Sequence, residues 1–244
     1  MELTITDGYL IPNHIYLCQT REGILFLNLR NEKYVGVSGA ELQCLRALVP
    51  GWPIGASQGD EPELPERAVQ AARKLRDAGL LTTDPRSGRA AHPPQVDDGA
   101  SSLLQHIPDS PSRGTLTHLV RLAYAAITVA GILKFRSLEG AVRRLRRRKV
   151  ASSAHIDTAV EATGIATLTR NFFRLRPFIY SSQDKCLYDC LVLLEFLAYF
   201  ELFPTLVIGV ATFPFRAHCW LQYGPLVLTD YLENIRVYTP ILVV

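Results

Sequence analysis

The sequence is poor in cysteine and in net charge, and each shortage excludes a class of protein. Five cysteines among 244 residues are few and odd in number, so a complete disulfide framework is not expected. A net charge of +3 beside 48% hydrophobic residues excludes an intrinsically disordered chain. Only 16 glycines and 15 prolines exclude a collagen-like repeat. A folded protein with a real hydrophobic core is left.

A signal peptide is also missing, because the N-terminal segment has neither a basic start nor a long apolar run. We therefore expect a cytoplasmic protein with reduced thiols. Two apolar stretches require a membrane test. Residues 122–133 are too few to span a bilayer, and residues 191–215 contain Glu195, Glu201 and Pro204. We interpret both as buried core elements and expect no stable membrane insertion.

The small net charge is the sum of a basic central segment and two mildly acidic terminal segments. Residues 1–85 carry a net charge of −3, residues 86–149 carry +8 and residues 150–244 carry −2. Much of the excess lies in the arginine-rich run at 143–149. Apolar residues at helical spacing within 138–145 give this segment a buried side. We interpret the run as a solvated helix face that could attract an acidic partner, and not as a nucleic-acid site.

The length indicates more than one ordinary domain, which has roughly 100–150 residues. Residues 86–114 are rich in proline, serine, glycine and aspartate and show little apolar periodicity. A loop this long is unusual inside a compact domain. We predict a first domain at 1–85, a linker at 86–114 and a second domain at 115–244.

The first domain has the pattern of a small α+β unit. A capping box at Ser38 and Glu41 predicts a helix start, and Gly79 predicts a helix end. Strands followed by two helices and a last short strand resemble a winged-helix arrangement. The expected strands are residues 9–18, 23–29, 34–37 and 80–82. One expected helix begins after Ser38, and the other spans 65–78.

The second domain places helices before strands, which indicates an α+β fold whose antiparallel sheet comes last. The expected helices span 116–133, 138–148, 153–163, 167–174 and 185–200, and the expected strands span 206–211, 217–223 and 226–230.

Cys186 is the first candidate for chemistry. It stands just inside a predicted helix that Ser181 or Asp184 could cap. Backbone N–H groups and the helix dipole favour a thiolate at such a place, and Lys185 adds positive charge. The alternative is an inert buried thiol.

His218 and Asp230 are the partners such a nucleophile needs. Strand alternation puts His218, Trp220 and Gln222 on one face and Cys219 on the other. A cysteine nucleophile requires a base, and a carboxylate can hold the imidazole in the right tautomer. The alternatives are a structural histidine and a turn aspartate.

Zinc binding is a competing use of Cys186, Cys190, His218 and Cys219. Adjacent strand residues point to opposite faces, so His218 and Cys219 cannot both meet one ion without a bulge. We expect no metal. No G-x-x-x-x-G-K motif for a nucleotide is present either, and no cofactor is expected.

These motifs together resemble one known family. Lys185-Cys186-Leu187, the block from Pro214 to Trp220 and Asp230 resemble the leader peptidases of lasso-peptide biosynthesis. The resemblance implies a transglutaminase-like, papain-related fold with a Cys-His-Asp triad of Cys186, His218 and Asp230. The segments 24–29 and 33–37 are similar to the precursor-recognition domain often fused to that peptidase. Three positions depart from the family pattern: Cys190 replaces a serine, Cys219 a small residue and Gln222 an acidic one.

The resemblance implies a substrate, a ribosomally made precursor whose leader docks as an added strand and is then cut off. A separate ATP-dependent cyclase would act on the freed amine, and no nucleic acid is implied. The residues expected to bind the leader are Lys33, Tyr34, Val35, Gly36, Val37, Ala72 and Leu75.

Two other functions fit the same residues. A transglutaminase-like acyltransferase would form the same thioester and pass it to an amine. A non-enzymatic adaptor would bind peptide or DNA through the first domain and would have an unreactive Cys186.

Overall fold

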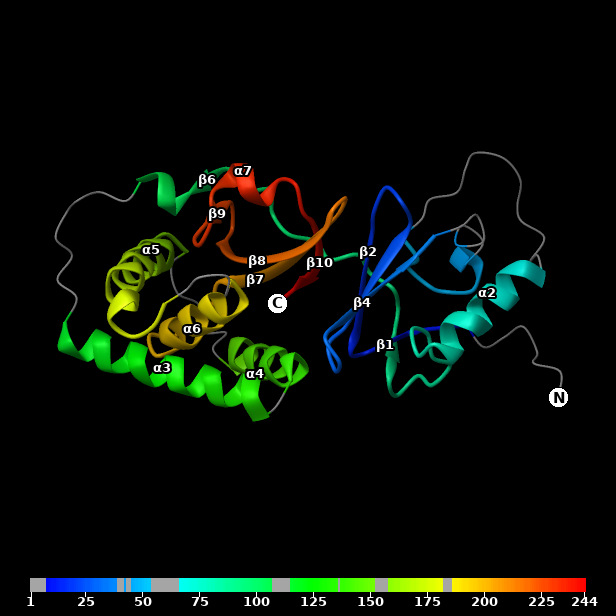
Figure 1. The fold of residues 1–244 in the computed structure, drawn as a ribbon, viewed down its shortest axis with the longest axis horizontal. Helices are drawn as coiled ribbons and strands as arrows, with labels where there is room; N and C mark the ends of the chain where they lie inside the picture. Colours follow the sequence, from blue (N-terminus) through cyan, green and yellow to red (C-terminus); the bar gives the residue numbers. More distant parts are fainter. Residues whose placement is uncertain are drawn as a thin grey trace. The chain divides into compact units, whose positions relative to one another are not determined.

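The computed structural model describes residues 8–38, 42, 45–53, 66–106, 115–135, 137–151, 158–181 and 186–244. The chain divides into two compact units, Met1–Gln95 and Val96–Val244, drawn in Figure 1. Each unit has its own β-sheet and its own hydrophobic core.

The sheet of the first unit is a three-stranded antiparallel meander. Its strands are β2 (Ile15–Gln19), β3 (Ile24–Asn28) and β4 (Lys33–Val37), in the order β2-β3-β4. Alternating apolar residues and the polar turn between β3 and β4 explain this hairpin, and its prediction is confirmed. In the described part of the chain β4 has β3 as its only strand neighbour.

The main helix of this unit, α2 (Glu66–Asp77), places its small apolar side in the core that also contains the buried side chains of the sheet. Gly79 ends the helix as predicted: it has φ +73°, and the N–H of Leu80 bonds to the Leu75 carbonyl at 2.8 Å. The helix expected after Ser38, with its capping box, lies mostly outside the described residues. Its described end is the 3₁₀ turn η1 (Leu45–Ala47). The winged-helix arrangement therefore stays a prediction.

The segment 86–114, which we predicted as a linker, contains two strands. β5 (Gly88–Arg89) pairs with β1 (Ile11–Pro12) in the first unit. β6 (Ser101–Ser102) pairs with a strand of the second unit. Both strands are only two residues long, too short for any periodicity to reveal them.

The sheet of the second unit has the order β10-β7-β8-β9-β6. Its centre is the long antiparallel pair β7 (Thr205–Thr212) and β8 (Phe215–Tyr223). β9 (Leu226–Val227) is shorter than the expected strand at 226–230. β10 (Thr239–Val243), which we did not predict, pairs with β7. β6 and β9 run parallel, so the sheet is not purely antiparallel as expected.

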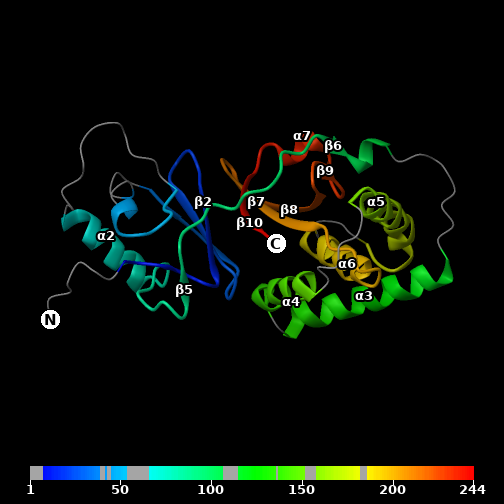
Figure 2. The ribbon, with the colours of Figure 1, turned by 180° about the vertical axis from the view of Figure 1, so that it is seen from behind.

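Four long helices lie on one side of this sheet and a short one lies on the other (Figures 1 and 2). α5 is a single helix where we predicted two, at 153–163 and 167–174, because Gly164 is tolerated inside it without ending it. The helices are α3 (Leu116–Phe135), α4 (Leu138–Ala151), α5 (Thr158–Leu175), α6 (Cys186–Ala198) and the short α7 (Leu232–Ile235), with a 3₁₀ turn η2 (Leu103–His106) before α3 and η3 (Arg176–Phe178) after α5.

The basic run on α4 is more than a solvated face. Glu195 of α6 is buried, and its two carboxylate oxygens accept from Arg144 at 3.0 Å and from Arg148 at 2.7 Å. A buried carboxylate needs such partners. The two arginines therefore hold α4 against α6. This corrects our interpretation of the arginine run as a face that contacts only solvent.

The two apolar stretches differ in burial. Residues 191–197 of α6 are buried, as predicted. α3 is buried along one side only, and Ile127 on its other side is 71% exposed, which corrects the interpretation of 122–133 as a core element. Among the described helices, α3 alone has the length and composition to cross a membrane, and 22% of its most apolar window is buried. Core helices of soluble proteins pass the same test.

Candidate active site

Cys186 is the first residue of α6 and is partly exposed. The helix packs against β8 through an apolar surface that begins one turn later, at Cys190. Backbone N–H groups at a helix start have no partner within the helix. The cysteine therefore meets the positive end of α6, as the sequence predicted. Ser181 is described and exposed, while Asp184 and Lys185 lie outside the described residues.

His218 lies on β8, opposite Gly209 of β7. Its ring stacks on Trp220, with centroids 6.3 Å apart and planes at 23°, and meets the Tyr238 ring at 5.3 Å. A Cβ atom at Gly209 would lie 2.8 Å from both Trp220 and Tyr238. A side chain at this position would therefore press on the Trp220 ring and on the Cβ of Tyr238, the two residues whose rings contact the imidazole.

Asp230 lies close to His218, with Oδ2 2.5 Å from Nε2 of the imidazole. Its other oxygen, Oδ1, accepts from the amide of Asn234 at 2.8 Å and from the N–H of Tyr231 at 2.7 Å. The hydroxyl of Ser102 donates to the backbone carbonyl of Asp230 at 2.6 Å. Both the carboxylate and its backbone are thus held in place.

The pKa values of Cys186 and His218 favour a thiolate–imidazolium pair. Hydrogen bonds from the Cys219 and His218 side chains lower the pKa of Cys186 to about 4, although burial opposes the change. Hydrogen bonds with Asp230 and Cys186 raise the pKa of His218 to about 10. A thiolate and an imidazolium therefore coexist at neutral pH, which is the reactive form of a cysteine nucleophile.

The surrounding thiols and the carboxylate support this charge state. Burial acts to raise the pKa of Asp230, but hydrogen bonds from His218, Asn234 and the Tyr231 N–H outweigh it and lower the pKa. Hydrogen bonds with Cys186 and Cys190, together with burial, raise the pKa of Cys219. The Cys219 thiol thus stays protonated and can donate to the Cys186 thiolate.

Gln222 has a structural role beside the site. It is buried, and its oxygen accepts from the indole N–H of Trp220 at 3.2 Å. Its amide nitrogen donates to the carbonyls of Asp97 at 2.6 Å and Gly224 at 2.7 Å. The neighbours His218, Trp220 and Gln222 share one face of β8, as strand alternation predicted.

Several residues that position the histidine and the aspartate were absent from our candidates. Ser102 stands 128 residues before Asp230, and only the tertiary fold brings it near, while Tyr238 follows Asp230 closely in sequence but reaches His218 only through the fold. Asn234 stands four residues after Asp230, a spacing that matches the helical turn α7, and could have been noticed.

The predicted leader-binding residues divide into two groups. Lys33, Tyr34, Val35, Gly36 and Val37 form β4, whose side chains are partly or fully exposed. Ala72 and Leu75 on α2 are buried in the core of the first unit. Their side chains contact that core and cannot contact a bound peptide, which corrects their assignment as binding residues.

The zinc alternative has no support among the described residues, where no group of three or more histidine, cysteine or acidic side chains could hold a metal ion. His218 instead hydrogen-bonds to Asp230.

Comparison with known proteins gave one match. The model of a family described as Transglutaminase-like superfamily matches residues 119–243. These residues include α4 to α7, β7 to β10 and the Cys186, His218 and Asp230 cluster. Neither the search of curated proteins nor that of solved structures gave a match.

Proposed function

The chain belongs to the transglutaminase-like superfamily, and we propose that its second unit is a cysteine peptidase that removes the leader from a ribosomally made lasso-peptide precursor. One observation carries the proposal: Cys186 at the start of α6 lies beside His218, whose Nε2 is 2.5 Å from Oδ2 of Asp230, and the interaction between the two lowers the pKa of the cysteine and raises that of the histidine. Superfamily membership supports a cysteine peptidase or an acyltransferase, and the resemblance of the motifs supports the narrower substrate.

The proposed reaction follows from the order of the three residues. The Cys186 thiolate attacks the scissile carbonyl carbon and forms a C–S bond. Asp230 occupies Nε2 of His218, so Nδ1 delivers the proton to the leaving amine as the C–N bond breaks. Water, deprotonated by the same nitrogen, then hydrolyses the thioester and releases the thiolate. The N–H of Cys186 at the start of α6 is a candidate donor to the oxyanion.

Leader binding is proposed for the edge of β4 that faces away from β3. Val35 pairs with Phe26 and points to the same face of the sheet. Phe26 is fully buried, while Val35 is 39% exposed, and among the described residues no strand pairs with the outer side of β4. A leader segment added as a fourth strand would bond to the β4 backbone and cover Val35. Tethering through the first unit would raise the local concentration of the scissile bond.

The proposed partners and location follow from this chemistry. The precursor leader is the direct ligand, and the product with its new free amine is the substrate of an ATP-dependent cyclase. Both steps would take place in the cytoplasm, where the Cys186 thiol stays reduced. Neither step uses a cofactor of this chain or a nucleic acid.

The test is to incubate the purified full chain with the precursor peptide and to analyse the products by mass spectrometry. We expect a free leader that ends in a carboxylate. The Cys186→Ala variant should bind the precursor and leave it intact, while Cys18→Ala, which removes a thiol of the first unit, should cleave it.

The products also distinguish a peptidase from an acyltransferase. A leader joined to an added amine would assign acyl transfer instead of hydrolysis. Cleavage by Cys186→Ala at the normal rate would contradict the assigned nucleophile.

A further inference from the structure

One side of α3 is exposed and largely apolar, with one charged residue, Lys134, in its last turn. Its large exposed apolar side chains are spaced by four, four, three and eight residues, which keeps them on one side of a helix. They are between 61% and 78% exposed. The sequence of α3 contains no aspartate or glutamate. We name this side the α3 apolar face; it consists of Leu116, Val120, Tyr124, Ile127 and Phe135.

The α3 apolar face is not part of the core of the second unit. The opposite side of the helix supplies Leu122, Ala125, Ala126 and Val129, which are all buried. α3 packs with that side against α6. About five turns of a 20-residue helix, roughly 30 Å long, therefore present apolar side chains to the outside.

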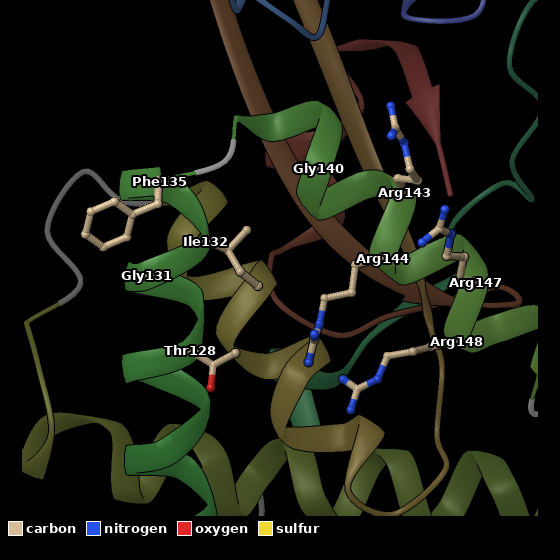
Figure 3. A pocket seen from close by; sticks show the side chains of 9 residues that line it. All are labelled: Thr128, Gly131, Ile132, Phe135, Gly140, Arg143, Arg144, Arg147 and Arg148. Carbon is tan, nitrogen blue, oxygen red and sulfur yellow. The ribbon is translucent and has the colours of Figure 1, made fainter.

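A groove of about 720 Å³ adjoins this face between α3 and α4 (Figure 3). Ile132 and Phe135 of α3 line one wall. Arg143, Arg144, Arg147 and Arg148 line the other. No residue of the Cys186, His218 and Asp230 cluster lines the groove, so it is separate from the proposed active site.

The charges at the groove do not cancel. Glu195 pairs with Arg144 and Arg148, and Glu139 pairs with Arg143 at 2.7 Å. Four guanidinium groups and two carboxylates give a formal net charge of +2. Each guanidinium carries five N–H donors, so its ion pair leaves donors for a further anion.

We propose that the α3 apolar face and the arginine wall of α4 bind the surface of a bilayer that contains anionic phospholipid. An apolar wall beside an arginine wall matches a phospholipid, whose acyl chains and phosphate lie next to each other. α3 lies in the plane of the interface with its apolar face inserted, because its other side stays packed on α6. Arginines near an anionic leaflet add electrostatic attraction.

The test is sedimentation of the full chain with vesicles. One set contains equal parts of phosphatidylcholine and phosphatidylglycerol, and the other contains phosphatidylcholine alone. The wild type should sediment with the anionic vesicles and much less with the neutral ones. Arg147→Glu reverses one charge and should weaken the apparent vesicle affinity roughly 30-fold. Val120→Glu on the apolar face should weaken it at least as much.

Two matched controls keep the test specific. Val237→Glu changes another exposed valine of this unit, and Arg236→Glu reverses another exposed arginine. Both should sediment like the wild type, and thermal unfolding checks that every variant is folded. Wild type that stays in solution with anionic vesicles would overturn the proposal, as would unchanged binding by both α3 and α4 variants. A wild-type dimer that Val120→Glu dissociates, without vesicle binding, would assign the face to a second copy instead.

Discussion

Nε2 of His218 and Oδ2 of Asp230 lie 2.5 Å apart, which fixes the orientation of the imidazole ring. With Nε2 occupied, the other ring nitrogen is the one available to Cys186. The aspartate is itself held by Asn234, Tyr231 and Ser102. Asn234, Tyr231 and Ser102 therefore help to decide which ring nitrogen of His218 faces Cys186, although none of them belongs to the triad.

The first prediction concerns the reactivity of Cys186. With a pKa of about 4, its thiolate fraction is nearly complete at pH 6, where an ordinary thiol with a pKa near 9 is about one-thousandth ionised. Its alkylation rate should therefore stay nearly constant from roughly pH 5 to pH 9 and fall only below that range. Site-resolved iodoacetamide labelling measures this.

Cys18 is the internal control, because burial raises its pKa to about 12. Its labelling should be slow throughout and increase with pH. Equal rates and equal pH dependence at Cys186 and Cys18 would favour the non-enzymatic adaptor over the peptidase.

The second prediction concerns Asp230. Hydrogen bonding to Asp230 is the largest cause of the raised His218 pKa, so Asp230→Asn should lower that pKa from about 10. Activity would then be lost at a lower pH on the alkaline side, and kcat should fall by about 10²- to 10⁴-fold. Histidine NMR titration and a pH–rate profile measure both effects.

Asn234→Ala provides a graded comparison for Asp230→Asn. It removes one hydrogen bond to Oδ1 and leaves the carboxylate in place. A loss of about 3- to 10-fold is expected, the equivalent of one ordinary hydrogen bond. A loss as large as that of Asp230→Asn would mean that the aspartate is positioned mainly by Asn234.

The third prediction concerns Gly209. An added methyl group would lie 2.8 Å from Trp220 and from Tyr238. Gly209→Ala should lower the free energy of unfolding by about 1–3 kcal/mol through overpacking, and should reduce activity by displacing the rings that hold His218. Urea unfolding and product formation measure the two effects.

Gly164→Ala is the matched control for Gly209→Ala. Its Cβ would make an ordinary contact at 3.7 Å inside α5, and alanine favours the helix. This variant should be as stable as the wild type or more stable, with normal activity. A harmless Gly209→Ala would contradict the positioning role of the two aromatic rings.

The fourth prediction concerns Glu195. Glu195→Gln removes the buried charge that Arg144 and Arg148 share. Because both arginines are partly exposed, we expect a loss of about 1–3 kcal/mol in the free energy of unfolding, less than for a fully buried pair. The exposed pair of Glu139 and Arg143 is the control, and Glu139→Gln should cost about 0.3–0.5 kcal/mol. Similar losses in the two variants would show that burial of Glu195 contributes little.

Much of the site could be predicted because its signals are local in the sequence. Alternation along β8 places His218 with Trp220, and a helix start places Cys186 where a thiolate is favoured. The glycine at 79 ends α2 for an equally local reason, its positive φ.

The rest could not be predicted because it depends on contacts between distant segments. Tyr238 reaches His218 only through the fold that pairs β10 with β7. Ala72 and Leu75 have helical spacing that fits either a binding face or a core face, and only the packed structure decides. The continuity of α5 through Gly164 is likewise set by packing and not by propensity.

The hydrogen bonds from segment 97–102 limit where the second unit can be separated from the rest of the chain. Ser102 supports Asp230, and the Asp97 carbonyl binds Gln222, so a fragment that starts at residue 115 would lack both supports. A fragment that starts at Val96, where the second unit begins, would retain them. A protein engineer who fuses this unit to a different domain should therefore place the fusion joint before Val96.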